Sequence, residues 1–461
     1  MGGPERKLTD LRFSRPLSVQ EDCWGSLSWS PDGKLLVFED KESPAGPFRL
    51  FLFSIAAGET WRLPIASKEF LDHVCPAFSP DGRTLAFIGV RGARSCDIYA
   101  VPVAGGRPTQ LTFDGRAIVG LAWTPDGREI VFSSEREGQS SRWRIPASGG
   151  TPKRLAEVGE NAMFPCLSRQ GRRLAFQREV EDTNIWRLDT RHQGGTRSST
   201  VKLIESTRRD ENPQFSPDGK RIAFVSDRSG NWELWVCASD GSNPIQLTSL
   251  GGPENGFPSW SPDGRSIAFD SNLKGNLDVF VIRTDGGSPR PLTTDTSADA
   301  RPSWSRDGRW IYFGSDGSGS WQVWKVPAQG GSAVQVTKKG GQTPAVSPGG
   351  KFVYYSKGPG LPGVWRVPAE AGEEEPVLPD YVHGFKASWA PMEGGIYFAD
   401  WEGSRGFLKF LNFSPRRVTE IVPPEKRWVT SLLSVSPDGR WLLFPQIDQA
   451  GQDLVLVENF R

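Results

Sequence analysis

One motif recurs along the whole chain and constrains the fold more than any other feature. Its most regular copy, residues 212–248, reads NPQFSPDGKRIAFVSDRSGNWELWVCASDGSNPIQLT. Ser216-Pro217-Asp218-Gly219 predicts a tight turn, because proline presets the first turn dihedral, aspartate tolerates the second corner and glycine allows a left-handed exit. Short β-rich runs follow at residues 221–225, 233–237 and 245–248. Each copy is therefore expected to form four antiparallel strands joined by short turns.

The copies can be counted from the aromatic residue that follows each turn. These aromatics are Phe38, Phe87, Phe132, Phe176, Phe224, Phe269, Phe313, Tyr355, Phe398 and Phe444. Successive positions lie 42 to 49 residues apart, so ten copies account for nearly the whole chain. The turns at residues 168–171, 347–350 and 390–393 are degenerate, yet their copies keep the aromatic.

A second aromatic series marks the third strand of most copies: Tyr99, Trp143, Trp186, Trp235, Phe280, Trp324 and Trp365. Aromatic residues in a fixed repeat register predict packing between copies rather than a surface for stacking sugars or bases. A thin four-stranded meander leaves two edges and two faces to cover, so it must stack on its neighbours. Units of 40 to 50 residues with four strands are typical of β-propeller blades. The predicted fold is all-β, a propeller of about ten four-stranded antiparallel blades.

The pattern SPDGKRIAFVSDRSGNWELWV followed by DGSNPIQLT resembles the Pro-Asp-type repeats of TolB-like propellers, which also occur in tricorn proteases and in the N-terminal propellers of prolyl oligopeptidases. The resemblance covers essentially the whole chain. The chain is also similar to the propeller halves of CadC-like winged-helix regulators and of some bacterial serine/threonine kinases. That similarity implies a sensor or interaction domain. The sequence shows no kinase-type Gly-rich loop, no HRD triplet and no winged-helix-type segment ahead of the first copy, so no DNA binding by this chain is expected.

The sequence allows either one ring or two. Tight hairpins inside nearly every copy favour a single ten-bladed propeller over residues 1–461. Residues 189–199 form the one stretched connection, and they suggest the alternative of a four-bladed propeller at 1–190 and a six-bladed one at 200–461. The last copy passes through residues 454–457 without a fourth strand. We therefore expect the N-terminal segment 15–18 to complete the last blade and close the ring.

Composition argues against several partner classes. The formal net charge is +1, so neither nucleic acid nor an anionic membrane is an expected partner. The longest apolar run, residues 50–57, is too short to span a bilayer, and the start of the chain lacks a signal-peptide core. A cytoplasmic location is the default expectation, with a periplasmic one if this is the sensor half of a longer protein. The five cysteines lack the spacing of a metal site or of a disulfide framework and are expected to be free thiols.

Signatures of catalysis are also absent from the sequence. The three histidines, His73, His192 and His383, lie in unrelated copies, and there is no G-x-S-x-G motif. Residues 358–363 formally match a dinucleotide fingerprint but contain two prolines and precede a strand, so they are interpreted as a blade loop. No catalytic residue, metal site or cofactor is predicted. Turn aspartates such as Asp81 and Asp218 are interpreted as structural.

Recognition is expected on the face where the connecting loops vary between copies, and in the axial channel. The candidate ligand-binding residues there are His73, Asp210, Glu211, Asp227, Arg228, Glu254, Asp299 and Arg301. We predict a non-enzymatic propeller that binds a protein segment or small ligand, as the sensor or interaction domain of a bacterial regulatory protein. The alternative is a propeller hydrolase or lyase that uses carboxylates and arginines in the channel.

Overall fold

The computed structural model describes residues 7–8, 26–43, 46–66, 70–92, 95–136, 140–155, 159, 161–170, 172–191, 200–251, 255–273, 275–357, 362–370, 372–381, 388–402, 405–422 and 432–460. Within these ranges the regular secondary structure consists of β-strands, and the all-β prediction is confirmed. None of these ranges contains a helix long and apolar enough to cross a membrane.

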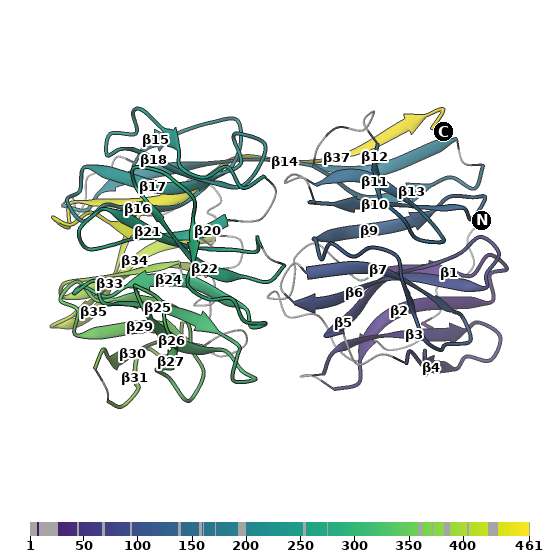
Figure 1. The fold of residues 1–461 in the computed structure, drawn as a ribbon, viewed down its shortest axis with the longest axis horizontal. Helices are drawn as coiled ribbons and strands as arrows, with labels where there is room; N and C mark the ends of the chain where they lie inside the picture. The colour runs from purple at the N-terminus through teal and green to yellow at the C-terminus, as the bar shows by residue number, and fades with distance from the viewer. Residues whose placement is uncertain are drawn as a thin grey trace. The chain divides into compact units, whose positions relative to one another are not determined.

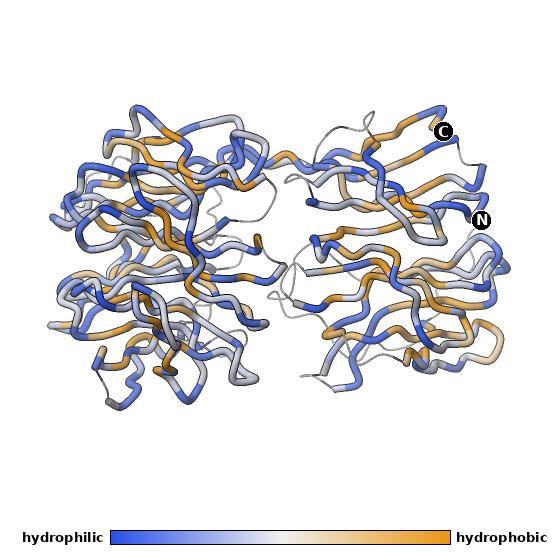
Figure 2. Tube along the Cα trace, viewed as in Figure 1, coloured by the Kyte–Doolittle hydropathy of each residue, from blue (hydrophilic) through white to orange (hydrophobic). Residues whose placement is uncertain are grey.

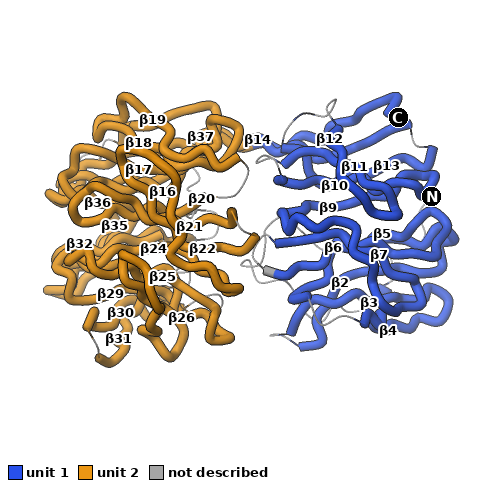
Figure 3. The backbone as a smooth tube through the Cα atoms, viewed as in Figure 1, with its two compact units in different colours: residues 1–180, 451–461 blue, residues 181–450 orange. Residues whose placement is uncertain are grey.

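The chain forms two compact units, shown in different colours in Figure 3. Unit 1 comprises residues 1–180 and 451–461, and unit 2 comprises residues 181–450. The two units are considered separately below.

Unit 1 contains three complete four-stranded antiparallel sheets and part of a fourth (Figure 1). The complete sheets are β1 (Leu27–Trp29), β2 (Leu35–Lys41), β3 (Phe48–Ser54) and β4 (Thr60–Arg62); β5 (Asp72–Phe78), β6 (Thr84–Gly92), β7 (Ser95–Pro102) and β8 (Thr109–Gln110); and β9 (Ile118–Trp123), β10 (Glu129–Ser134), β11 (Ser141–Pro146) and β12 (Lys153–Arg154). The fourth sheet contains β13 (Ala162–Leu167), the start of β14 (Arg173–Asp189) and the end of β37 (Trp441–Glu458).

Unit 2 contains five complete sheets of the same kind. They are β16 (Asp210–Phe215), β17 (Arg221–Ser226), β18 (Glu233–Ala238) and β19 (Ile245–Gln246); β20 (Asn255–Trp260), β21 (Ser266–Ser271), β22 (Asp278–Arg283) and β23 (Arg290–Pro291); β24 (Asp299–Trp304), β25 (Trp310–Ser315), β26 (Gln322–Pro327) and β27 (Val334–Gln335); β28 (Gln342–Val346), β29 (Phe352–Ser356), β30 (Val364–Pro368) and β31 (Glu375–Leu378); and β32 (Trp389–Met392), β33 (Gly395–Glu402), β34 (Arg405–Phe413) and β35 (Arg416–Val422). A sixth sheet combines β36 (Ser434–Val435), the start of β37, the end of β14 and β15 (Thr200–Ile204).

The two long strands show that copies four and ten exchange their outer strands. Each copy was expected to reverse direction after its second strand, but β14 and β37 continue without a turn from one unit into the other. In unit 2 the side-chain amide of Asn184 on β14 donates to the Asp448 carboxylate on β37 over 2.9 Å. In unit 1 the N–H of Phe460 donates to the carbonyl oxygen of Arg172 over 3.0 Å. Each incomplete sheet is thus extended by a strand from the other copy.

The six sheets of unit 2 follow one another around a closed ring. The inner strands contact each other in the order β36, β16, β20, β24, β28 and β32, and β32 again contacts β36. The main-chain N–H of Phe215 donates to the Ser434 hydroxyl over 3.0 Å and joins β16 to β36 at the point of closure. Closure leaves the inner strands without open edges around a central axis.

The ring closure in unit 2 bears on the division of the chain. The closed ring places β16 beside β36, and both strands belong to unit 2. Residues 15–18, expected to complete the last blade, lie outside the described residues. Among the described strands, the blade that contains β36 takes its outer strands from β14 and β15. The number of rings in the whole chain stays a prediction.

The repeated aromatics form the core between sheets, as predicted. Phe87, Phe132, Phe224, Phe269 and Phe313 are almost fully buried, while Phe38 is half-buried. Trp235 packs with Phe224 in one hydrophobic cluster of unit 2. Figure 2 shows the hydrophobic stretches running along the strands, with hydrophilic residues concentrated in the turns. Burial of these side chains is what stabilises sheets that are too thin to form a core alone.

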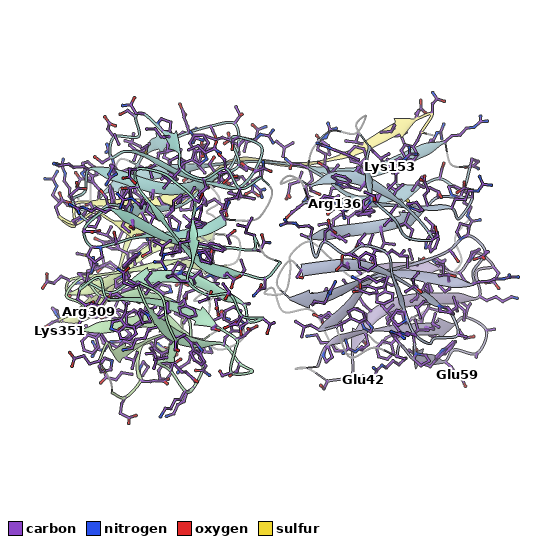
Figure 4. The ribbon with its side chains drawn as sticks, viewed as in Figure 1. Glu42, Glu59, Arg136, Lys153, Arg309 and Lys351 are labelled. Atoms are coloured by element: carbon purple, nitrogen blue, oxygen red, sulfur yellow. The ribbon has the colours of Figure 1, made fainter. Side chains whose placement is uncertain are left out.

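The Ser-Pro-Asp-Gly turns are held by a repeated hydrogen-bond pattern. In the turn at residues 216–219, the Ser216 hydroxyl donates to the Asp218 carboxylate over 2.6 Å, and the N–H of Arg221 donates to the Ser216 hydroxyl over 2.9 Å. The hydroxyl donor lowers the pKa of the Asp218 carboxyl. Arg309, labelled in Figure 4, pairs with the turn carboxylate of Asp307 over 2.5 Å. These aspartates are turn residues, as interpreted from the sequence.

Candidate ligand-binding channel in unit 2

A cavity of about 250 Å³ follows the axis of unit 2. The inner strands of all six sheets contribute to its wall. Its lining includes residues 257–260 of β20, 301–304 of β24, 343–346 of β28 and 389–391 of β32, together with Arg306. Ligand sites are generally concave, and this channel is a concavity at the centre of the ring.

Each complete inner strand from β16 to β28 is interrupted by a β-bulge beside the channel. The strand register shifts at the bulge, and one non-glycine residue has a positive φ: Asn212 at 51°, Phe257 at 42°, Arg301 at 58° and Thr343 at 49°. A proline follows each of them and cannot donate to the sheet ladder, which explains why the ladder breaks there. A positive φ is rare for bulky or β-branched residues and costs about 1–3 kcal/mol. The bulges therefore store strain around the channel.

Arg301 is the charged residue of this ring of bulges. Its main-chain N–H donates to Oδ2 of Asp270 on β21 over 2.7 Å, which holds the strained backbone. Its guanidinium lies over the Phe257 ring, with 4.8 Å from the guanidinium carbon to the ring centroid. A Cβ on Gly256 would lie 2.6 Å from the other Asp270 oxygen, so glycine is required there for Asp270 to reach Arg301. Three residues of the preceding sheet thus position this side chain.

Indole groups supply further donors along the channel. The Nε1 of Trp260 donates to the carbonyl oxygen of Gln214 over 3.0 Å. By contrast, the buried Nε1 atoms of Trp304 and Trp389 have no hydrogen-bond partner. Buried polar groups are normally satisfied, so an unpartnered indole N–H at a cavity wall is a candidate ligand donor.

The electrostatic character of the channel is cationic. Arg301 and Arg306 are its charged lining residues, and no Asp or Glu is among the described residues that form the wall. The Nε of Arg306 donates to the carbonyl oxygen of Ser347 over 3.2 Å, and burial lowers the pKa of the Arg306 guanidinium. Two guanidinium groups, aromatic faces and spare N–H donors suit a ligand that carries a carboxylate and an apolar side chain.

The structure brings the predicted residues Asp210 and Arg228 together, but they bond to each other within one blade. Arg228 donates to Oδ1 of the fully buried Asp210 over 2.7 Å, and its guanidinium also lies 5.2 Å from the Phe224 ring centroid. The N–H of Arg209 donates to Asp227 over 2.8 Å. Glu211 is half-buried on β16. Asp210, Asp227 and Arg228 already have partners and are not in the lining of the channel.

Asp299 lies two residues before Arg301 and has an unusual environment. Its side chain is 1% exposed, and Oδ1 has no hydrogen-bond partner. Burial, together with the charges of Asp295 and Asp278, raises the pKa of the Asp299 carboxyl to about 7 despite donors from Ser315 and Thr293. A buried carboxyl group that titrates near neutral pH is a feature that functional sites share.

Of the two remaining predicted residues, His73 does not line the channel. His73 belongs to unit 1, where it is 3% exposed and packs between Phe70 and Phe87 at ring distances of 5.3 and 5.2 Å. Burial lowers the pKa of His73 to about 3, so it is a neutral core residue. Glu254, His192 and His383 lie outside the described residues. Within the described part of the chain, no group of three or more His, Cys, Asp and Glu side chains is placed to hold a metal ion.

Three bulge residues, Asn212, Phe257 and Thr343, and the channel residue Trp389 were missed from the sequence. A signal was available, since a proline stands three residues before the first turn residue in six of the ten copies: Pro76, Pro165, Pro213, Pro258, Pro302 and Pro344. A proline inside a predicted strand indicates an edge or a bulge, and a repeated one indicates a ring of bulges. Of the predicted residues, Arg301 lines the channel, and Asp299 lies two residues before Arg301 on β24 without lining the channel.

The ring of four-stranded sheets around an axial channel defines a β-propeller protein. The family model described as PD40, TolB beta propeller domain, matches residues 14–254 and 252–427. The chain belongs to this TolB-like PD40 β-propeller family.

Curated relatives include proteins of different kinds. The chain is 30% identical over 203 residues to the uncharacterized protein Atu1656 of Agrobacterium fabrum, a match that covers 42% of this chain and 67% of that protein. It is 23% identical over 269 residues to dipeptidyl-peptidase 5 of Porphyromonas gingivalis, covering 53% of this chain and 38% of the peptidase. It is 27% identical over 235 residues to tricorn protease homolog 1 of Streptomyces coelicolor, covering 48% and 20%. The matches thus span well under half of each peptidase.

Among solved structures, a putative TolB from Agrobacterium tumefaciens is 18% identical and matches 74% of this chain and 94% of its own, with a TM-score of 0.32. TolB from Acinetobacter baumannii is 17% identical and matches 92% and 82%, with a TM-score of 0.29.

Proposed function

We propose that the protein is a non-enzymatic propeller that binds an extended protein segment, or a small ligand, through a carboxylate held in the channel of unit 2. The observation that carries the proposal is the lining of the channel, which has two arginines, several aromatic faces and no carboxylate among its described residues. We further propose that this binding serves a sensor or interaction role in a bacterial regulatory protein, as the sequence resemblance implies.

The physical support is electrostatic. An anion that enters the channel meets Arg301 and Arg306 without a competing carboxylate on the described wall. Hydrogen bonds to charged groups are about twice as strong as neutral ones, and they gain further strength where water is excluded. The free Nε1 of Trp304 and Trp389 can donate to carbonyl oxygens of a bound chain. Arg301 is also pre-oriented by Asp270 and Phe257, which reduces the ordering cost of binding.

The size of the channel favours the end of a chain over a bulky ligand. Its volume of about 250 Å³ lies just below the usual range of ligand cavities, which starts at about 300 Å³. Two of the relatives are named as peptidases, and a peptide is accordingly the ligand class that we put first. A chain terminus offers both a carboxylate and an apolar side chain.

A hydrolase or lyase that uses channel carboxylates is the alternative. It has less support, because the described channel wall contains no Asp or Glu to act as a general acid or base. Asp299 is the nearest candidate from the sequence, and it does not line the cavity. Turnover of a peptide substrate that is lost in Asp299→Asn and unaffected by Arg301→Gln would favour the enzyme.

The proposal is tested with a peptide array that presents random segments with a free C-terminal carboxylate, next to the same segments with an amidated C-terminus. Binding is followed by the fluorescence of the channel tryptophans. We expect binding to require the free carboxylate and to weaken roughly tenfold or more in Arg301→Gln, since one charge-assisted hydrogen bond is lost. Glutamine keeps a long polar side chain.

Arg309→Gln is the matched control, because Arg309 lies on an exposed turn of the same sheet and pairs with Asp307. It should bind as the wild type does. Equal binding of amidated peptides, or full binding by Arg301→Gln, would contradict the proposal.

A further inference from the structure

A second cavity, of about 520 Å³, lies in unit 2 away from the channel. It opens between the end of β31 and the outer strands of the next sheet, β33 to β35. Its lining includes Tyr381 on one side and Phe398, Lys409, Leu411 and Val418 on the other. None of these residues lines the axial channel.

The strand register explains how this cavity acquires an apolar floor. Phe398 on β33 lies opposite Lys409 on β34, and Leu411 on β34 lies opposite Val418 on β35. Because side chains alternate along a strand, these residues share the face that looks toward β31. The Tyr381 hydroxyl donates to the carbonyl oxygen of Ala399 over 2.7 Å and fixes the opposite wall. The cavity is therefore a rigid slot between two sheets.

The strand at its rim is unusual for this protein. β35 has seven residues, whereas the outer strands β19, β23 and β27 have two each and β31 has four. It is the last strand of its sheet, and no strand within the described residues pairs with its outer edge. Val418 is 48% exposed. A long exposed edge is a template for the addition of another strand.

The charge at the rim indicates the chemistry of a partner. The Asp400 carboxylate is neutralised by Lys409, whose ammonium lies 2.7 Å away. Arg416 donates to the carbonyl oxygen of Val377 over 2.6 Å and has no carboxylate partner among the described residues. Arg417 also lines the cavity, with Asp380 as the other carboxylate there. The balance is cationic along the first part of β35.

We propose that β35 receives an extended acidic segment of a partner protein as an additional strand. Main-chain hydrogen bonds along the edge would provide affinity. One large apolar side chain of the segment enters the slot above Phe398 and Leu411, and a neighbouring carboxylate pairs with Arg417. This surface is independent of the channel, so the inference stands or fails separately from the proposed function.

The test uses a displayed library of random nine-residue segments, selected on the full chain and counter-selected on Val418→Trp, in which the indole fills the slot. We expect the retained segments to combine a large apolar residue with at least one Asp or Glu. Synthetic peptides of these sequences should bind roughly tenfold more weakly to Arg417→Glu. Arg309→Glu, an equal charge change on an exposed turn, should leave binding unchanged.

Amide hydrogen exchange distinguishes strand addition at β35 from binding elsewhere on the protein. Strand addition should slow exchange of the amides of residues 416–422 when peptide is bound. The inference is overturned if no segment is retained over Val418→Trp, if Arg417→Glu binds as the wild type does, or if protection appears elsewhere, including on the inner strands β20 and β24.

Discussion

The main-chain N–H of Arg301 donates to Oδ2 of Asp270 over 2.7 Å, and this bond joins an inner strand to the second strand of the preceding sheet. A related bond occurs in unit 1, where the N–H of Cys75 donates to Oε2 of Glu39 over 2.9 Å. Both donors have a positive φ and precede a proline. In both cases a buried carboxylate of the neighbouring sheet accepts a hydrogen bond from the main-chain N–H of the strained bulge residue. The same bond therefore holds the strained backbone and joins the two sheets.

Asp270→Ala should therefore affect both stability and binding. It leaves the Arg301 N–H without its acceptor, and an unsatisfied buried donor costs about 1–3 kcal/mol. The variant should unfold at lower urea concentration, and carboxylate-dependent peptide binding should weaken because Arg301 is less well oriented. Asp285→Ala is the control, since Asp285 is an exposed carboxylate of the same sheet that pairs with Arg283. Unchanged stability of Asp270→Ala would show that the bulge holds its shape without this bond.

A second recurring hydrogen-bond pattern, centred on a threonine hydroxyl, joins the third and fourth strands of a blade. In the sheet formed by β20 to β23, the N–H of Val279 donates to the Thr293 hydroxyl over 2.9 Å, and that hydroxyl lies 3.3 Å from Asp278. Thr112, Thr248 and Thr337 bond in the same way to Asp97, Glu233 and Gln322 in other sheets.

Thr293→Val removes this bonding while nearly conserving shape. The N–H of Val279 loses its acceptor, so we expect the free energy of unfolding of unit 2 to fall by about 1–3 kcal/mol. Chemical denaturation measured by tryptophan fluorescence tests this. Thr294→Val, at the exposed next residue, should change stability by less than about 0.5 kcal/mol. Equal effects of the two variants would mean that the hydroxyl is replaceable.

The repeat period was enough to predict the blades. Each blade packs on its neighbour through a buried aromatic residue at the same strand position, so the aromatic recurs once in every copy. Phe224 and Phe313 occupy equivalent buried positions on β17 and β25 for this reason. The exchange between copies four and ten could not be predicted in the same way. Phe176 and Trp186 are 10 residues apart, as are Tyr355 and Trp365 in a copy that does form a hairpin. Spacing alone does not distinguish a strand that turns back from one that continues.

The candidate site was predictable only in part. Arg301 was found because it is a charged residue at the start of an inner strand, and the structure places it in the channel. Asp210, at the start of an inner strand, and Arg228, in a loop, were also proposed as charges of the variable face, but they bond to each other inside one blade. A loop charge in the sequence does not reveal whether a partner of opposite sign lies on the adjacent strand. The tryptophans Trp304 and Trp389 were not among the candidates from the sequence, and their unpartnered indole N–H groups became apparent only from the geometry.

His73 should make unit 1 sensitive to acid. Its pKa is lowered from about 6.5 to about 3 by burial and by the charges of Arg49 and Arg62. Below pH 6.5 the unfolded chain therefore binds a proton that the folded unit does not, and stability is lost as the pH falls from 6.5 toward 3, by at most about 1.4 kcal/mol per unit. His73→Phe should remove this contribution. The stability difference between variant and wild type should grow from pH 7 to pH 5; a constant difference would contradict the burial of a neutral imidazole.

Asp299 should make the stability of unit 2 depend on pH in the opposite sense, with a loss of stability as the pH rises. Its folded pKa of about 7 lies above the value of about 3.9 for an unfolded chain, because burial and the charges of Asp295 and Asp278 disfavour the carboxylate. Between these two values the folded protein holds a proton that the unfolded chain has released. The contribution of Asp299 to the free energy of unfolding is therefore fully present below about pH 4. It declines as the pH rises to 7, by at most about 1.4 kcal/mol per pH unit.

Asp299→Asn replaces the carboxyl with a group that does not titrate, so the variant should become more stable relative to the wild type as the pH rises from 5 to 7.5. Urea unfolding of both proteins across that range measures the difference directly, and other titrating groups cancel in the comparison. Asp285→Asn should show no such trend, since the Asp285 pKa is lowered by Arg283 and lies below the range tested. If the two stability curves stay parallel, Asp299 is ionised throughout, and the unpartnered Oδ1 must then be reached by a donor from solvent or from a ligand.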